Sequence, residues 1–231
     1  MSTFHHKIRG QMWLLPFLAI GMMRAQLEVQ LGLGPQMTIN VTKFSNTTIS
    51  QNGFGLFGGP VLVYSVTDNV RFGAEILFSW GRYSTEEREE DMVFVNGALR
   101  ERYTTYKSSH NTTFLKLPLT ARYAIDAQNI RFEIGAGLQP FFWLTSTSKY
   151  TTTEEIPEIN RRETTVRTEN NFSGGTTGIN RAGIAAVLLA GASFSKFGVY
   201  LRYDPMLTSL SQDVRSVQNT LGLMLTYKIL E

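Results

Sequence analysis

Apolar and polar residues alternate with a period of two along much of this chain. Within residues 115–123 every odd position is apolar or aromatic, whereas Lys116 and Arg122 lie on the other face. After a break at residues 124–129 the apolar positions return in even register over residues 132–144. A period of two is typical of a β-strand with one apolar and one polar face. This stretch therefore predicts two antiparallel strands joined by a tight turn.

The same pattern recurs in the rest of the chain and predicts eight strands in all. Pro60 interrupts the second strand, and we expect a β-bulge there because proline cannot donate to a sheet ladder. The connections are long after the first, third, fifth and seventh strands and short after the others, an asymmetry typical of outer-membrane barrels. The predicted strands are residues 27–34, 54–66, 71–80, 115–123, 131–144, 181–194, 197–204 and 220–229.

Two of the long connections predict raised β-hairpins. Residues 81–110 contain Asn96-Gly97, the strongest two-residue hairpin signal. Folding about this pair brings charges of opposite sign together across the strands, which stabilises a hairpin. A second hairpin is expected within residues 145–178, bending near Pro157, and residues 38–52 and 205–217 are expected to be polar loops. The predicted charge pairings are Asp91 with Arg102, Glu86 with Lys107, and Glu154 and Glu155 with Arg161 and Arg162.

The polar faces of the predicted strands carry nine charges, which a lipid-facing surface would not accommodate. An eight-stranded barrel is just wide enough for side chains to fill it. We therefore expect these charges to pair in a closed lumen, while the apolar faces contact lipid and aromatic residues form girdles at both strand ends. The predicted interior charges are Glu28, Arg71, Glu75, Lys116, Arg122, Arg131, Glu133, Arg202 and Lys228.

The N-terminal residues 1–25 predict a secretory signal peptide, with a basic start, a short apolar run and Ala25 at the expected cleavage site. The whole chain has 22 basic and 19 acidic residues. Removing the segment takes away Lys7, Arg9 and Arg24 and no acid, so the remaining chain is formally neutral. A nucleic-acid partner is therefore not expected. The absence of Cys fits an exported protein that does not depend on disulfides.

These patterns predict an all-β protein: residues 26–231 form an eight-stranded antiparallel transmembrane β-barrel with long extracellular hairpin loops. The alternative fold is a secreted β-sandwich or a lipocalin-like barrel. A lipocalin-like barrel would place apolar residues inside, which disagrees with the nine charges on the polar faces.

Three short motifs along the chain are Leu115-Lys116-Leu117-Pro118-Leu119, continuing to Arg122-Tyr123, then Gly135-Ala136-Gly137-Leu138, and Leu201-Arg202-Tyr203. The first is similar to an L-x-x-P-L-x-x-x-Y strand of the outer-membrane β-barrel (porin-like, PorT-type) proteins of Gram-negative bacteria. The other two resemble two further strands of that family. The resemblance implies an outer-membrane location, contact with outer-membrane lipid, and a secretion or envelope protein as a partner.

The last strand is similar to the C-terminal signal that the barrel assembly machinery reads. The residues that carry this similarity are Thr220, Gly222, Leu225 and Tyr227, and the chain departs from the usual pattern in ending on Glu231 and not on an aromatic residue. The resemblance implies the assembly machinery as a second partner.

No motif in the sequence predicts a catalytic, cofactor or metal site, and we expect a structural, surface-interaction or secretion-accessory role. His110, the only histidine after residue 25, lies beside Ser108 and Ser109. A lipid-modifying enzyme that uses His110 is therefore one alternative, although no acid that would orient the histidine is apparent. A divalent cation bound by the acidic residues 86–91 and a narrow pore are others. The expected cross-strand cations favour a charged hairpin over the cation site.

Overall fold

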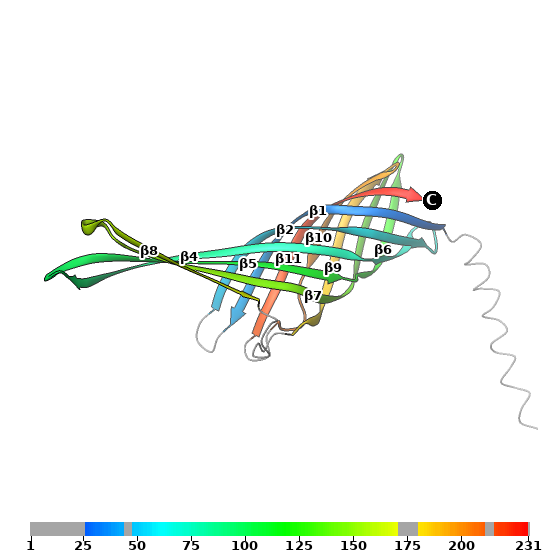
Figure 1. The fold of residues 1–231 in the computed structure, drawn as a ribbon. Helices are drawn as coiled ribbons and strands as arrows, with labels where there is room; N and C mark the ends of the chain where they lie inside the picture. Colours follow the sequence, from blue (N-terminus) through cyan, green and yellow to red (C-terminus); the bar gives the residue numbers. More distant parts are fainter. Residues whose placement is uncertain (1–25, 44–47, 171–179, 211–214, 231) are drawn as a thin grey trace, which may run out of the picture.

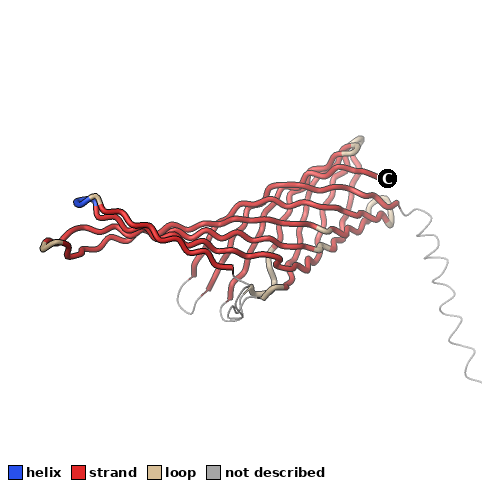
Figure 2. Tube along the Cα trace, in the orientation of Figure 1, coloured by secondary structure: helices blue, strands red, loops and turns tan. Residues whose placement is uncertain are grey.

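The structure of the chain, a computed structural model, describes residues 26–43, 48–170, 180–210 and 215–230, most of which lie in β-strands (Figure 2). Among these residues no helix has the length and hydropathy of a membrane span. The helical structure that they contain is a 3-10 turn, η1 (Pro157–Ile159). The predicted signal peptide lies outside the described residues. The strands are β1 (Gln26–Lys43), β2 (Thr48–Ser65), β3 (Val70–Glu75), β4 (Leu77–Val95), β5 (Ala98–Lys116), β6 (Leu119–Ala127), β7 (Ile130–Ile156), β8 (Arg161–Asn170), β9 (Ala182–Phe194), β10 (Phe197–Asp204) and β11 (Arg215–Leu230).

The strands close on themselves to form a barrel (Figure 1). β1 pairs with β2 on one side and with β11 on the other, and every pairing around the ring is antiparallel. Ile76 alone separates β3 from β4, and Leu117 and Pro118 separate β5 from β6, so each of these pairs acts as one long strand. The described strands thus form a ring of eight, with β8 added outside it on β7. The predicted antiparallel all-β barrel is confirmed.

The break between β3 and β4 lies opposite Pro60 of β2. The Ile76 N–H donates to the carbonyl oxygen of Pro60 at 3.0 Å. The pairings of β2 with β3 and with β4 keep one register on both sides of the proline. The predicted β-bulge at Pro60 is therefore wrong, because the proline interrupts the ladder without adding a residue to the strand.

Apolar side chains cover the outside of the barrel and polar ones face the lumen. Along β10, buried and exposed residues alternate without exception. The exposed set is Phe197, Val199, Leu201 and Tyr203, and the buried set is Gly198, Tyr200, Arg202 and Asp204. The aromatic side chains expected at the strand ends, such as Phe72 and Trp80, are exposed on this outer surface. The short connections, residues 66–69, 128–129 and 195–196, lie at the end where the described chain starts and stops.

At the opposite end, β4, β5, β7 and β8 continue far beyond the barrel rim as a four-stranded sheet (Figure 1). We call this sheet, residues 86–107 and 151–166, the blade. Its first hairpin turns at Asn96 and Gly97, both with positive φ. The two predicted cross-strand pairings of this hairpin are confirmed, since Asp91 lies opposite Arg102 and Glu86 lies opposite Lys107.

The second hairpin of the blade, β7 with β8, turns through η1. Glu155 lies opposite Arg162 as predicted, but Glu154 lies opposite Glu163 and not opposite an arginine. Its carboxylate is instead 3.9 Å from the Arg102 guanidinium of the first hairpin. Arg100 and Glu158 form another ion pair between the hairpins, at 2.6 Å. Ion pairs thus join the two hairpins into one unit.

The segments predicted as polar loops are partly strand. β1 extends to Lys43 and β2 starts at Thr48, so most of residues 38–52 is paired sheet. β11 likewise begins at Arg215, within the segment predicted as a loop. The loop prediction is wrong for β1 because apolar and polar residues still alternate there, with the buried Thr38 and Asn40 between Met37, Ile39 and Val41. At the starts of β2 and β11 both faces are mostly polar, so no alternation marks the strand.

A charge placed on the outer face of the barrel should destabilise it. Leu201, between the aromatic Phe197 and Tyr203 of β10, is 54% exposed, and Leu99 at the blade tip is 59% exposed. Leu201→Arg should lower the free energy of unfolding by about 2–4 kcal/mol, because lipid does not solvate the guanidinium. Leu99→Arg should change the free energy of unfolding little, because water solvates a guanidinium at the blade tip. Urea titrations in lipid vesicles measure both variants, and equal effects would contradict the lipid-facing assignment.

Candidate functional site: a filled lumen below a polar mouth

Eight charged side chains from the inward faces of strands around the ring meet inside the lumen. Each is less than a tenth exposed, although charged residues are almost never fully buried unless they are paired. The set contains four carboxylates and four cations, so its formal charge is zero. Its members are Glu28, Glu75, Glu133, Asp204, Arg71, Lys116, Arg122 and Arg202.

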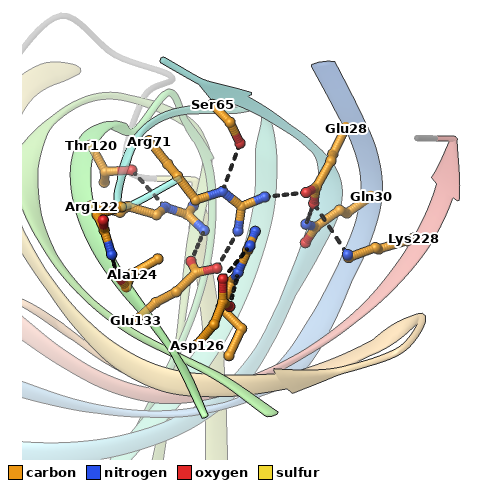
Figure 3. Close-up of polar contacts among 12 residues, drawn as sticks. Glu28, Gln30, Ser65, Arg71, Thr120, Arg122, Ala124, Asp126, Glu133 and Lys228 are labelled. Atoms are coloured by element: carbon orange, nitrogen blue, oxygen red, sulfur yellow. Dashed lines mark hydrogen bonds and ion pairs between the residues drawn. The ribbon is translucent and has the colours of Figure 1, made fainter. Parts of the chain in front are cut away.

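Arg71 of β3 occupies the centre of the part of this network that lies near the short connections (Figure 3). Its guanidinium forms ion pairs with Glu28 of β1 and Glu133 of β7, and its Nε donates to Ser65 Oγ at 3.1 Å. Lys228 of β11 lies at the edge of this group, with Nζ 3.7 Å from Glu28. Strands that are distant in sequence are therefore joined through one guanidinium.

Arg122 and Arg202 carry the network toward the other end of the barrel. Arg122 Nη1 is 3.6 Å from Glu133, and its Nη2 donates to Glu75 at 2.8 Å. The second oxygen of Glu75 accepts a hydrogen bond from Arg202 at 2.5 Å, and Arg202 Nε donates to Asp204 at 2.7 Å. Each carboxylate at the centre of the network thus lies between two guanidinium groups.

Lys116 ends the network beside a small cavity. Its Nζ is 3.6 Å from Asp204 and 3.4 Å from the amide oxygen of Gln36, and Gln36 in turn donates to Ser79 Oγ at 2.7 Å. The adjoining cavity has a volume of about 20 Å³, room for about one water molecule.

Apolar side chains fill the rest of the lumen at this level. They pack around Tyr200, whose ring centroid is 5.8 Å from the Arg122 guanidinium. A second apolar cluster, Phe114, Phe141, Ala185 and Leu210, lies above the network. Side chains thus occupy the interior as in a packed core. The other members of the lower cluster are Phe57, Leu77, Val187, Leu189 and Met224.

The structure places seven of the nine predicted interior charges in this network. Arg131 lies instead near the rim, where it donates to Asp126, its cross-strand neighbour on β6, at 2.6 and 2.8 Å, and Lys228 is partly exposed. Both lie at strand ends, where alternation continues past the buried part of the lumen. Asp204 belongs to the network but is absent from the predicted set. Its place on the polar face of its strand, two residues after Arg202, was the signal for it.

The four residues of the predicted assembly signal lie on β11, which pairs with β1 and β10. Thr220 is buried, whereas Leu225 and Tyr227 are exposed on the outer face. Gly222 lies against the ring of Phe57 inside the barrel. Their recognition by the assembly machinery stays a prediction.

The mouth of the barrel, above the filled lumen, contains His110. Its Nδ1 is 2.7 Å from Ser148 Oγ of the neighbouring strand β7. The adjacent serines are engaged elsewhere: Ser108 bonds to Thr85, and Ser109 accepts a hydrogen bond from Arg82. The register of β5 against β7 places Ser148 opposite His110. The sequence alone does not give this register.

The acidic residues 86–91 lie on the blade. The carboxylate of Asp91 accepts hydrogen bonds from Nε and Nη2 of Arg102, and Glu86 accepts a hydrogen bond from Lys107 at 3.0 Å. The Arg102 hydrogen bonds lower the pKa of Asp91 below its usual value. Among the described residues, no group of three or more His, Cys, Asp or Glu is arranged to hold a metal ion.

Glu133→Ala should destabilise the barrel strongly, because it leaves Arg71 and Arg122 short of a carboxylate in a dry interior. We expect a loss of about 3–5 kcal/mol in the free energy of unfolding, as for other broken buried ion pairs. Glu86→Ala removes an exposed ion pair of the blade and is the matched control, with a much smaller expected loss. Urea unfolding in lipid vesicles compares the two, and a similar loss for both variants would show that the network is solvated.

His110 should titrate below its ordinary pKa. Burial of the imidazole lowers the pKa of His110 from the usual 6.5, so the unfolded chain binds the proton first as pH falls. The stability that the neutral ring contributes is therefore complete above pH 6.5 and is lost as the pH falls below it. Because His110 is the only histidine after residue 25, histidine-labelled protein comprising residues 26–231 gives one imidazole signal by NMR. A midpoint at or above 6.5 would contradict this environment.

This chain is similar to one protein family and, at low sequence identity, to several solved structures. The family model of the outer membrane protein β-barrel domain matches residues 22–212. Among solved structures, Neisserial surface protein A is 13% identical with a TM-score of 0.38, covering 89% of this chain and 99% of that one. Ail, the attachment invasion locus protein of Yersinia pestis, is 11% identical with a TM-score of 0.32, covering 87% and 98%. The outer membrane enzyme PagL is 9% identical with a TM-score of 0.35, covering 84% and 99%.

A search of the curated proteins finds no match to this chain. The finer resemblance to PorT-type proteins stays a prediction. Because the family model spans most of the chain, the protein belongs to the outer membrane protein β-barrel domain family.

Proposed function

We propose that this protein is a non-conducting and non-catalytic anchor that presents the blade outside the outer membrane for contact with a protein partner. The observation that carries the proposal is the contrast between the two ends of the same strands. β4, β5 and β7 form part of a filled barrel at one end and an exposed sheet at the other (Figure 1).

The filled lumen supports the non-conducting part of the proposal. An ion crossing this level would have to displace charges that already bond to each other, for example Glu75 between Arg122 and Arg202. Since the buried set is formally neutral, it offers neither cations nor anions a favourable field. Selective channels instead use rings of backbone carbonyls or rings of side chains of one charge sign.

The blade tip supports the binding part of the proposal. Met92, Phe94 and Leu99 lie on one face of the first hairpin and are 56%, 73% and 59% exposed. Phe94 and Leu99 lie directly opposite each other across the hairpin. Exposed apolar groups that are surrounded by charged residues mark surfaces for protein contact. Backbone pairing of β5 with β7 and ion pairs between the two hairpins support this face, and a preorganised surface lowers the entropic cost of binding.

The resemblance to PorT-type proteins suggests where such a partner acts. Members of that family serve secretion, so the expected partner is a secreted or envelope protein. The chemistry of the tip adds that the partner presents an apolar patch with a charged border.

An enzyme acting on outer-membrane lipid is the second candidate, because the Ser148 hydroxyl lies 2.7 Å from His110 Nδ1. A nucleophilic serine also needs a group that orients the histidine. The described ring contacts of His110 are Tyr83 and Tyr150, and both residues line the inside of the mouth with it. A lipid substrate would have to leave the outer face of the barrel to reach this pair, which favours the anchor.

Photo-crosslinking in intact cells tests the anchor directly. A crosslinker at Phe94 should capture a discrete protein partner, whereas one at the lipid-facing Leu225 should not. A second crosslinker at Tyr103, on the same face of the hairpin, should capture the same partner. Replacing Met92, Phe94 and Leu99 by serine should lower the yield of that adduct about tenfold, the equivalent of about 1.4 kcal/mol of binding free energy. Val166→Ser, at a similarly exposed blade residue outside the tip, is the matched control.

Several outcomes would contradict the anchor. Equal adducts from Phe94 and Leu225 would remove the tip as a binding surface. Stable conductance steps of the wild-type protein in planar bilayers would favour a narrow pore. A changed lipid composition in cells with His110→Ala, with the barrel still folded, would favour the enzyme.

A further inference from the structure

The mouth of the barrel contains a pocket that the anchor function does not use. It has a volume of about 270 Å³ and lies between inward-facing residues of β1, β2, β4, β5, β7 and β11. Its volume is near the lower limit of small-molecule sites, which span about 300–1,000 Å³. The apolar cluster that includes Leu210 closes it below, and Gln218 separates it from the small cavity beside Lys116.

Aromatic rings form one wall of this pocket. The Tyr83 and His110 rings are stacked, with centroids 4.7 Å apart and an interplanar angle of 16°. Tyr150 meets His110 edge-on, with centroids 5.9 Å apart. Three rings from three neighbouring strands therefore hold one another in place. Such a wall offers a flat, rigid and uncharged surface on which a ligand can stack.

Asn40 supplies an unsatisfied donor in the same pocket. Its side chain lines the pocket and is 8% exposed, and its amide Nδ2 has no hydrogen-bond partner in the structure. A buried donor without a partner is costly, so most such groups are bonded to protein, water or ligand. Asn40 thus has a free hydrogen-bonding group where a bound molecule would lie.

The remaining lining is polar but uncharged. It consists of hydroxyl and amide side chains such as Thr42, Gln51 and Thr112. No Asp, Glu, Lys or Arg is among the described residues that line the pocket. Phosphate, sulfate or carboxylate groups would find no cation there, and amines would find no carboxylate. A wholly apolar ligand would leave the Asn40 amide unpaired.

We propose that this pocket binds a neutral saccharide unit. A sugar ring has hydroxyls that accept and donate hydrogen bonds, and a C–H face that packs on an aromatic ring. These properties match the Asn40 amide, the surrounding hydroxyls and the Tyr83–His110 wall. The proposal is independent of the blade tip, so either can fail without the other.

The test uses mature full-length protein in phosphocholine micelles, which contain no sugar, with the single His110 imidazole as the NMR reporter. N-acetylglucosamine and glucose are the neutral probes, and glucosamine and glucuronate are their charged counterparts. The neutral probes should shift the His110 signal saturably, with Kd in the millimolar range, and the charged ones should bind more weakly. Asn40→Ala and Tyr83→Ala should each raise Kd about tenfold.

Tyr106→Ala, at an exposed tyrosine of the blade outside the pocket, is the matched control and should leave Kd unchanged. A folded barrel changes its mobility on a gel when the sample is heated, and retention of this shift identifies variants that are folded. The two pocket variants test the site separately. No saturable shift with either neutral sugar at about 100 mM, a hundredfold above a 1 mM Kd, would overturn the proposal. So would equal binding of the charged sugars, or unchanged Kd in both folded pocket variants.

Discussion

The hydrocarbon core of a membrane offers no hydrogen-bond partner to a peptide group, so each strand that crosses it needs a paired neighbour on both edges. In this protein the pairing of β1 with β11 meets that requirement and closes the ring. Closure at eight strands then makes the lumen so narrow that side chains from opposite walls touch. Inward-facing charges are thereby removed from water, and they are tolerated because each one meets an opposite charge. The neutral network of four carboxylates and four cations is thus a consequence of backbone pairing in lipid.

The network also explains why the lumen is not simply apolar. A buried ion network is often no more stable than apolar residues of the same volume. Register gives it a different role here. A slip of one residue in β3 would turn Arg71 toward lipid and Phe72 into the lumen, and both changes are unfavourable. The interior charges therefore penalise incorrect strand pairing more strongly than apolar residues would. The outer face is apolar along the whole length of the barrel, so it does not by itself select one register. The penalty from the interior charges is therefore useful.

Period-two alternation predicts those parts of the fold in which one face meets lipid. It identifies the strands around Leu201 and Leu223, and the Asn96-Gly97 signal identifies the first hairpin of the blade. It does not identify the strand starts around Ser50 and Arg215, because there both faces are mostly polar. In β1 the alternation continues through Met37, Ile39 and Val41, beyond the predicted end of the strand. Alternation also predicts that Arg71 and Glu133 face inward, but not that they touch, since contact depends on register across the ring. The same limit applies to His110 and Ser148, which are 38 positions apart in sequence.

The Glu75–Arg202 contact has a consequence for how the barrel forms. The two residues are 127 positions apart, and Arg202 belongs to the next-to-last strand of the ring. Until β10 is in place, Glu75 lacks one of its two guanidinium partners. Contacts of such long range form late, because closing the long intervening chain costs conformational entropy before the contact can stabilise the structure. A partly assembled sheet therefore carries uncompensated charge along its inner face, which keeps that face hydrated. Expulsion of water from the lumen and arrival of the last strands become a single cooperative event.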